Sequence, residues 1–378
     1  MADPTYDQIS ASTIADMQAD VVYDEFFVEG SMQRKLRASG ILDEYLGGTD
    51  MRTPFVYGRV AGGAHTPGGD VNVVQTNLLA ATSFQPKEYI EIVPLNLWEV
   101  NVINSGPNAK VRLADLFMSN AVTALNTDLG IDWYRHGQAS STTVTDNRAI
   151  FINGAAEFLN DGVNPSWDGN VFQYIGGQIR NGVVGNVLNS VPRYAGGNGE
   201  TGQMSYSRIL EPYLDCVKEP DIIVSNKAAW AYMAERQEPK QGFVMEKDVT
   251  IGYQGLKVMN AYWHIDKLAP STKYGSILPS GMSQTTSVSP SNFTAPATVT
   301  SLSGMTSGWT IVPGEILFMF RVAGWFIRPV ADEEFAFNFT PPIRSQSNPD
   351  LVVMFLKAGI NFYTPSCRDN VHVFGFGF

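Results

Sequence analysis

The sequence predicts an α+β fold in which extended strands carry most of the structure and one long helix spans the molecule. Strand-like patterning runs through residues 51–104 and again from residue 315 onward, and a helical pattern covers 110–136. Hydrophobic residues make up 44% of the 378 positions, and the 35 glycines and 21 prolines are typical of a chain rich in strands and turns. A chain of this length has enough residues to bury a sizeable core.

Residues 1–50 are acidic and show short helical patterns, including one near 12–27. A second short helix is expected after Gly30, and it carries a small basic cluster. We interpret this cluster as a solvated helix face, with contact with a polyanion as the alternative. The cluster consists of Arg34, Lys35 and Arg37. The opening residues MADPTYDQIS have neither the basic nor the apolar region of a secretory signal.

Residues 51–106 predict a long β excursion. The strand-like segments TPFVYGRV and VNVVQTNLL flank AGGAHTPGGD (61–70), whose four glycines and one proline predict a loop tip. A further strand-like segment, EYIEIVPLNLWEVNVI, covers 88–103. Because a two-stranded excursion is a poor core element on its own, we expect it to pack on a partner surface such as another subunit.

Residues 107–140 predict one long helix over 110–136, stopped by Gly137. Its apolar positions recur every four residues, so they would form one buried face. At 1.5 Å per residue the helix would be about 40 Å long, enough for a strut across the molecule. The recurring residues are Leu113, Phe117, Ala121, Leu125 and Leu129.

Residues 141–330 predict a mixed α/β lobe. Loops and short strands come first, followed by a helix in SYSRILEPYLDCV. The segment EPDIIVSNKAAWAYMAERQEP (219–239) then predicts a buried strand, a polar cap and a helix, and 249–265 is β-rich. About half of residues 280–310 are Ser or Thr, which predicts a polar surface insertion. The last segment, 331–378, is again β-rich.

The charge balance excludes some function classes. With 37 acidic and 26 basic residues the net charge is −11, so we do not expect binding to nucleic acid by global attraction. Charged residues are only 17%, which favours a surface largely buried against partners. No apolar run approaches the roughly 18 residues of a membrane span. Cys216 and Cys367 lie in unrelated contexts, so we expect two reduced thiols and no disulfide framework or zinc site.

Motifs that carry chemistry are nearly absent. GNGETG (197–202) has the GxGxxG spacing, but a dinucleotide site needs it to open a helix, with an acidic residue at the end of the next strand. Asp221 lies at the right distance but begins the next strand, so we interpret the glycines as a surface turn. The sequence contains neither a phosphate-binding GxxxxGK[ST] loop nor a GxSxG nucleophile elbow.

The titratable side chains form no local site either. His264, in YWHID, would share a strand face with Asp266; we interpret it as a structural histidine, with an oriented imidazole as the alternative. An acidic run at 332–334 is interpreted as a solvated turn, with an intersubunit ion pair or a catalytic pair as alternatives. We therefore expect no catalytic, cofactor-binding or metal-ligating residues. The scattered histidines are His65, His136 and His372, and the acidic run is Asp332-Glu333-Glu334.

The order of these parts resembles the major capsid proteins of tailed bacteriophages, which have the HK97-like fold. The likeness covers most of 50–378 and includes several short segments. These are NSG (104–106), INGAAEFLNDG (152–162), PDIIVSN (220–226) followed by Trp230, Tyr232, Glu235 and Gln237, and GYQGLKV (252–258) followed by Asp266.

The resemblance implies a division into named parts. The polar insertion and the short N-terminal segment depart from the family pattern, and the latter implies a separate scaffolding protein or a segment already cleaved off. The parts are an N-terminal arm (1–50), an E-loop β excursion (51–106), the spine helix of the P domain (107–140), an α/β A domain (141–330, with the insertion at 280–310) and a closing β-segment of the P domain (331–378).

The resemblance also implies a function: a non-enzymatic protein that self-assembles as hexamers and pentamers into an icosahedral phage head around double-stranded DNA. The expected partners are further copies of itself, with the E-loop over a neighbour, and scaffolding, portal and decoration proteins. The enclosed DNA would lie close to the shell without sequence-specific binding, and no membrane partner is expected. The expected location is the virion, which is assembled in the host cytoplasm. Lys87 lies in the excursion, but no motif assigns to it the Lys–Asn crosslink of some members.

Two other functions remain open. One is an encapsulin, a cellular compartment shell with the same fold and a protein cargo in place of DNA. The other is an α/β enzyme with its site at the strand–helix edge near 221–230, where Ser225 or Asn226 would cap the helix. No base, metal ligand or phosphate loop accompanies that edge in the sequence.

Overall fold

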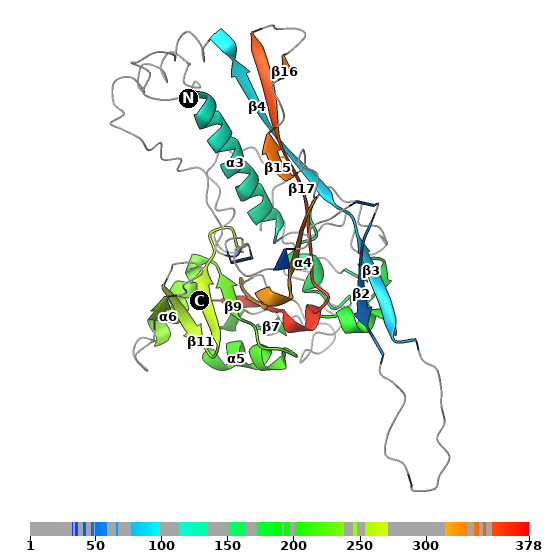
Figure 1. The fold of residues 1–378 in the computed structure, drawn as a ribbon. Helices are drawn as coiled ribbons and strands as arrows, with labels where there is room; N and C mark the ends of the chain where they lie inside the picture. Colours follow the sequence, from blue (N-terminus) through cyan, green and yellow to red (C-terminus); the bar gives the residue numbers. More distant parts are fainter. Residues whose placement is uncertain are drawn as a thin grey trace.

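The computed structural model of the chain has two large β-sheets, one long helix and a hairpin that extends away from them (Figure 1). Several predictions lie outside the residues it describes: the helix near 12–27, Arg34 and Arg37, His65 and His136, the acidic run at 332–334 and the insertion at 280–310. The described residues are 32, 35–36, 41–42, 47–48, 50–58, 66, 77–98, 113–134, 151–162, 172–180, 182–190, 193–196, 201–237, 245–247, 254–270, 314–330, 336–339, 343–344 and 350–377.

The six-stranded sheet is organised around β17 (Leu351–Tyr363). β4 (Lys87–Asn96) runs antiparallel to it over its whole length, from Lys87 opposite Ile360 to Asn96 opposite Leu351. The other edge of β17 pairs with three short strands, and β1 adds to one of them in parallel. The short strands are β1 (Ile41–Leu42), β14 (Phe326–Pro329), β15 (Ala336–Phe339) and β16 (Ile343–Arg344).

Helix α3 (Leu113–Asp132) lies along the extended part of this sheet (Figure 1). The predicted apolar face is confirmed at Ala121, Leu125 and Leu129, which are buried. The predicted C-terminal end at Gly137 is wrong, because the helix ends at Asp132. Two buried aromatic residues, Trp133 and Tyr134, follow and turn into the core. The described helix is therefore about 30 Å long, not 40 Å.

The eight-stranded sheet forms the compact lobe, in the order β10-β11-β12-β9-β13-β18-β7, with β8 also beside β18. β9 is parallel to β12 and antiparallel to β13. The strands are β7 (Arg193–Tyr194), β8 (Gly202–Gln203), β9 (Ile222–Ser225), β10 (Met245–Lys247), β11 (Gln254–Val258), β12 (Ala261–Ile265), β13 (Glu315–Phe320) and β18 (Val371–Gly377).

Both faces of the eight-stranded sheet are covered, because alternate residues of its central strands enter two different cores. Ile223, Leu317 and Val373 pack with α5 (Tyr206–Asp215) and α6 (Lys227–Gln237). Their neighbours on the other face join the larger core; they include Ile222, Val224, Phe318 and Phe374. The sequence prediction that β9 is buried on both faces is confirmed.

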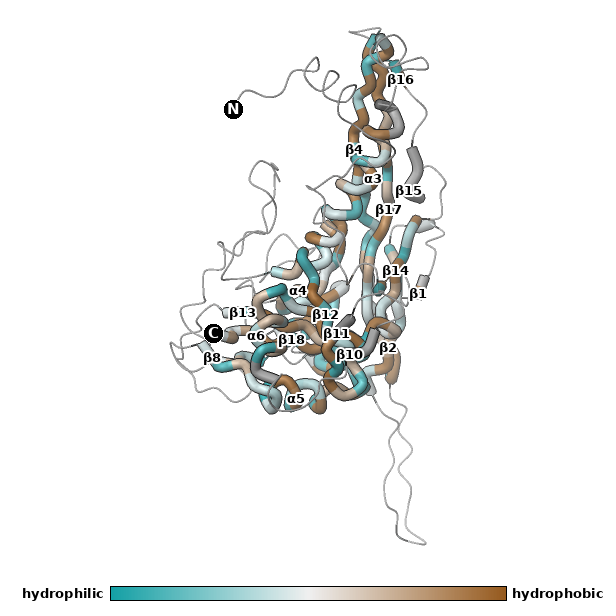
Figure 2. The backbone as a smooth tube through the Cα atoms, turned by 90° about the vertical axis from the view of Figure 1, so that its left-hand side faces the viewer, coloured by the Kyte–Doolittle hydropathy of each residue, from teal (hydrophilic) through white to brown (hydrophobic). Residues whose placement is uncertain are grey.

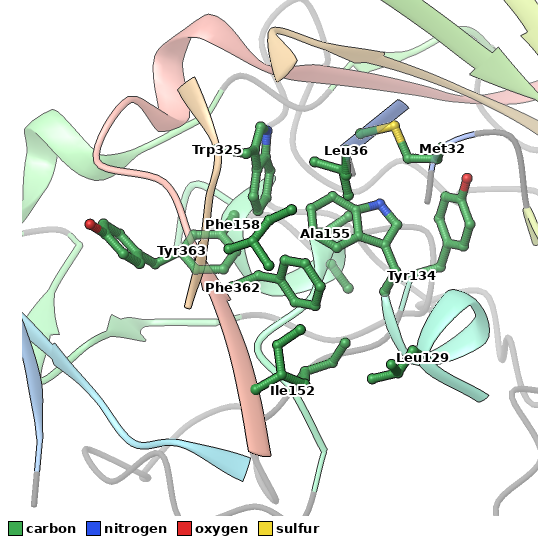
Figure 3. Close-up of a cluster of buried hydrophobic side chains, with 14 of the residues drawn as sticks. Met32, Leu36, Leu129, Tyr134, Ile152, Ala155, Phe158, Trp325, Phe362 and Tyr363 are labelled. Atoms are coloured by element: carbon green, nitrogen blue, oxygen red, sulfur yellow. The ribbon is translucent and has the colours of Figure 1, made fainter. Parts of the chain in front are cut away.

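The larger core is an aromatic cluster where the end of α3, the two sheets and the short helix α4 (Ala155–Phe158) meet (Figure 3). Trp133 is central: its ring centroid lies 4.5 Å from that of Trp325 and 5.1 Å from that of Phe362, both edge-on. Phe158 lies 5.1 Å from Trp325. Aromatic side chains bury large apolar areas and prefer such edge-to-face contacts, so this cluster joins the extended sheet to the lobe.

The two large sheets combine strands from different segments of the division expected from the sequence. β4 lies within 51–106 but pairs with β17 from the last segment, and β17 and β18 of that segment enter different sheets. Three 3-10 turns, η2 (Gly185–Leu188), η4 (Val322–Gly324) and η5 (Cys367–Asp369), complete the lobe. None of the described helices combines the length and apolar character needed to cross a bilayer.

Candidate assembly surfaces

The outer face of the six-stranded sheet exposes apolar side chains. Residues of β4 alternate between two faces, so Ile90 and Ile92 point away from α3 and are 47% and 63% exposed. Phe355 and Val353, the cross-strand neighbours of Ile92 and Pro94, lie on the same face. We call this surface the outer stripe: Ile90, Ile92, Pro94, Val353, Phe355 and Ile343. Figure 2 shows brown segments along β4 and β17 in this extended part.

The inner face of the same sheet packs on α3. Val93 and Leu95 are buried there, in the core that also contains Leu125. Closer to the lobe the contact becomes polar: Tyr89 Oη donates a 2.7 Å hydrogen bond to Asp132 Oδ2. Burial, with the nearby Asp132 carboxylate, raises the pKa of Tyr89. One strand thus contributes a helix-packing face and an exposed apolar face.

A second surface lies on the hairpin of β2 (Met51–Val56) and β3 (Leu79–Phe84). Its inner face is buried: Phe84 is 2% exposed and lies in the larger core. Its far end exposes the cross-strand pair Val56 and Leu79, at 61% and 67%. These two side chains form a small exposed apolar surface at the end of the described strand pair.

A short hairpin, β5 (Tyr174–Ile175) and β6 (Gln178–Ile179), holds the β2–β3 hairpin to the lobe. The amide of Ser83 donates to Gly176 O at 2.9 Å, and Gln178 Nε2 donates to Ala81 O at 2.9 Å. Gly176 has φ +51, and a Cβ there would lie 2.6 Å from Thr82 Cβ. Only glycine allows this close approach without strain.

A third exposed apolar area lies on α5 and the residues after it. Leu214 is 61% exposed and Val217 68% exposed, while Ile209 and Tyr213 on the opposite side are buried. The helix predicted in SYSRILEPYLDCV is present as α5, and Pro212 lies inside it and is buried.

Comparison with known proteins depends on structure, since no family model and no curated protein matches this sequence. The capsid of the cyanophage A-1(L) superposes with a TM-score of 0.58 at 11% identity, covering 96% of this chain and 97% of that one. The capsid of a native GTA particle gives 0.56 at 8% identity, covering 97% of both chains. The chain has an HK97-like capsid fold.

The same fold also occurs in a shell of another kind. The holo-SrpI encapsulin complex from Synechococcus elongatus PCC 7942 superposes with a TM-score of 0.52 at 9% identity, over 97% of this chain. Phage capsids and an encapsulin therefore share the HK97-like arrangement found here.

Within the HK97-like lobe, the strand–helix edge near 221–230 holds the fold together. Asn226 caps α6, because its Oδ1 accepts the amide of Ala229 at 2.9 Å while its Nδ2 donates to buried Glu315. Ser225 does not cap; its Oγ accepts a 2.7 Å hydrogen bond from Trp263 Nε1. These polar groups are all buried.

The histidine and aspartate of YWHID have separate surroundings. His264 is buried in β12 with its ring 6.3 Å from that of Tyr262. Asp266 instead accepts hydrogen bonds from Met32 N at 3.0 Å, Tyr134 Oη at 2.9 Å and Leu268 N at 2.8 Å. These distant partners could not be predicted from the sequence, in which the only signal is an acidic residue at the end of an apolar strand.

Two lysines named in the sequence analysis, Lys35 and Lys87, are buried in the structure. The prediction of a solvated helix face is wrong for Lys35, which is 8% exposed because its neighbours Met32 and Leu36 enter the core. Burial raises the pKa of Asp221, and the positive charge of Lys35 counteracts this. Lys87 is buried at the start of β4.

A buried cation was not predicted from the sequence at all. Arg180 is inaccessible, and its Nη1 donates to Asn160 O at 2.8 Å and Leu188 O at 2.5 Å. Burial lowers the pKa of this guanidinium. His372 is also buried, which lowers its pKa to about 3. Across the described ranges, no three His, Cys, Asp or Glu side chains gather as metal ligands would.

Proposed function

We propose that the protein is the major capsid protein of a tailed phage, which assembles as hexamers and pentamers into an icosahedral head around double-stranded DNA. The outer stripe is the observation that carries this proposal. β4 is ten residues long, and its outer face exposes two isoleucines; this is costly for an isolated subunit, since exposed apolar area of this kind favours association. The HK97-like fold supports the same conclusion.

The E-loop of this chain is the β2–β3 hairpin and the residues that connect its strands. β4 belongs to the sheet of the P domain, because it pairs with β17 throughout. The hairpin is anchored to its own subunit through Gly176 and exposes Val56 and Leu79 at its far end. In the assembled head this end lies over a neighbouring subunit and buries its apolar pair there.

The relation to DNA is one of enclosure. The chain has a net charge of −11, so the shell does not attract phosphates as a whole. Weak, salt-insensitive association of empty shells with DNA is the expected result. Strong binding that weakens steeply with salt would contradict this part of the proposal.

Negative-stain microscopy of the purified full-length protein tests the proposal directly, with closed particles as the expected result. The variant Ile92→Asp places a charge in the outer stripe without touching the core, so it should remain folded and form no particles. Val183→Asp makes a matched change at an 87% exposed valine outside the stripe and should assemble normally. Particles from Ile92→Asp at the wild-type yield would show that the stripe is not an assembly surface.

The hairpin needs its own experiment. Tyr57 N donates to Leu78 O at 3.0 Å, so the strands are still paired just before residues 59–76. Replacing 59–76 with Asn-Gly would close the hairpin with a two-residue turn and leave the core unchanged. The expected product is a folded subunit whose shells are absent or dissociate at lower urea. Shells as stable as the wild type would contradict the proposal that the end of the hairpin binds a neighbouring subunit.

An encapsulin is the second candidate, favoured by the superposition on the holo-SrpI complex. The two functions differ in their contents. Particles purified from the native source should contain double-stranded DNA if this is a phage head, and a packaged protein if it is an encapsulin.

A further inference from the structure

Two carboxyl groups meet in the contact between α3 and β4. Glu91 lies on the inner face of β4, between the buried Val93 and the tyrosine that binds Asp132. Asp128 lies on α3, one helical turn before Asp132, so both aspartates face the same strand. Glu91 is half-buried two residues beyond Tyr89, so the Tyr89–Asp132 hydrogen bond places it opposite Asp128.

The neighbours of Glu91 on the inner face of β17 are apolar. Its cross-strand partner on β17 is Leu356, and the inner-face residues on either side of Leu356 are Met354 and Ala358. Lys357 is the nearest cation along β17, but it pairs with Ile90 and therefore belongs to the outer face. On α3 the facing titratable groups are both acidic, Asp128 and Asp132. On the inner face of β4, Tyr89 donates to Asp132, and the buried Lys87 lies four residues, about 13 Å, before Glu91.

We propose that Glu91 and Asp128 share one proton, and that this makes the contact between α3 and β4 a pH-dependent joint. With the proton present, one carboxyl group donates to the other and the helix is held against the sheet. When it leaves, two carboxylates face each other in a half-buried site and repel, so the joint loosens.

The direction of the pH dependence follows because the folded chain binds this proton more tightly than the unfolded chain does. Burial, and then the charge of Asp128, raise the pKa of Glu91 from 4.5 to about 7. Between these two values the folded chain binds more protons at this site than the unfolded chain. Stability from this pair is therefore greatest in acid, falls as the pH rises through that window, and is constant above it.

The joint lies on the strand that also carries the outer stripe, because Glu91 stands between Ile90 and Ile92. When α3 packs less tightly on the inner face of β4, the outer stripe on the other face of the same strand is held less rigidly. Both carboxyl groups belong to one chain, so this inference does not depend on the shell function and can be tested on dissociated subunits.

The test compares Glu91→Gln with wild type by urea unfolding of the full chain from pH 5 to pH 8.5. Glutamine retains the shape and donates to Asp128 at every pH, so its midpoint should fall less than the wild-type midpoint between pH 5 and 7.5. Glu88→Gln is the matched control, because it removes the same charge from the exposed outer face of β4; its profile should follow the wild type. Other buried carboxyls, such as Asp266, titrate in all three proteins and cancel in the comparison.

A local measurement distinguishes loosening of the contact between α3 and β4 from a change in the stability of the whole chain. Amide exchange of peptides from β4 and α3 is compared between variants at the same pH. At pH 8 we expect wild-type exchange there to be about tenfold faster than in Glu91→Gln, as one pKa unit of lost coupling would give, with no difference at pH 5. Equal pH profiles for wild type and Glu91→Gln would overturn the proposal. Asp128→Asn makes the same prediction from the helix side and serves if Glu91→Gln does not fold.

Discussion

The backbone amide of Met32 donates a 3.0 Å hydrogen bond to Asp266 Oδ2, across 234 positions of sequence. The same oxygen accepts Tyr134 Oη, and Oδ1 accepts the amide of Leu268. One buried carboxylate therefore ties the N-terminal segment, the residues after α3 and the loop after β12 to one another. The N-terminal segment is consequently part of the folded core at Met32 and Leu36, both of which are nearly inaccessible.

Asp266→Ala should lower the free energy of unfolding by about 3 kcal/mol, because it leaves three donors in a buried site without their acceptor. Urea denaturation followed by circular dichroism measures this. Tyr134→Phe removes only one of the three donors and should cost about 1 kcal/mol. Glu211→Ala, on the exposed side of α5, is the control and should leave the midpoint unchanged. A wild-type midpoint for Asp266→Ala would show that this carboxylate does not hold the segments together.

The cap of α6 gives a second prediction. Asn226→Ala removes the acceptor for the Ala229 amide and a donor to buried Glu315. The expected loss is about 2 kcal/mol, since a cap and a buried hydrogen bond are lost together. Lys227→Ala changes the next residue, which is exposed, and should have little effect. If thermal unfolding gave the two variants equal melting temperatures, the capping role would be refuted.

Local patterns were sufficient where the structure depends on neighbours in sequence. The apolar run of β9, the polar residue after it and the helix that follows all lie within 20 residues, and each was predicted in place. The apolar face of α3 was predicted for the same reason, because its residues recur every four positions.

Long-range partners could not be predicted from those patterns. Strand texture at β4 is a local property, whereas its pairing with β17 depends on a register with residues more than 250 positions away. For Asp266 the sequence offered only a local partner, His264, and that pairing was kept as an alternative to a structural histidine. Lys35 was placed on a solvated face because the sequence does not reveal that Met32 and Leu36 beside it enter the core.

Adjacent glycines in the β5–β6 turn give a third prediction. Gly176→Ala should cost about 3 kcal/mol, because φ is +51 and the new Cβ would lie 2.6 Å from Thr82 Cβ. Gly177→Ala has a similar positive φ but no atom within 4 Å, so only the backbone strain of about 1 kcal/mol remains. Urea unfolding of the pair separates steric docking from turn strain. Equal losses would mean that the close approach to β3 contributes nothing.

The two thiols give the last prediction, and it concerns pH. Burial raises the pKa of Cys367 to about 11, and burial with the nearby Asp369 and Asp215 carboxylates raises that of Cys216 to about 12. A raised pKa keeps each thiol protonated and unreactive at pH 8, where an ordinary thiol near pKa 8.5 is already partly thiolate.

Ellman's reagent should therefore label the native protein slowly across pH 7 to 9. Glutathione is the control, and its rate of reaction should increase as the pH is raised over the same range. Addition of urea should release both thiols in every chain, since Cys216 and Cys367 are free. Cys367 is inaccessible, so its labelling should follow global unfolding, and destabilising variants such as Asp266→Ala should speed it. Rapid labelling of one thiol in the native protein at pH 8 would contradict the raised pKa of that thiol.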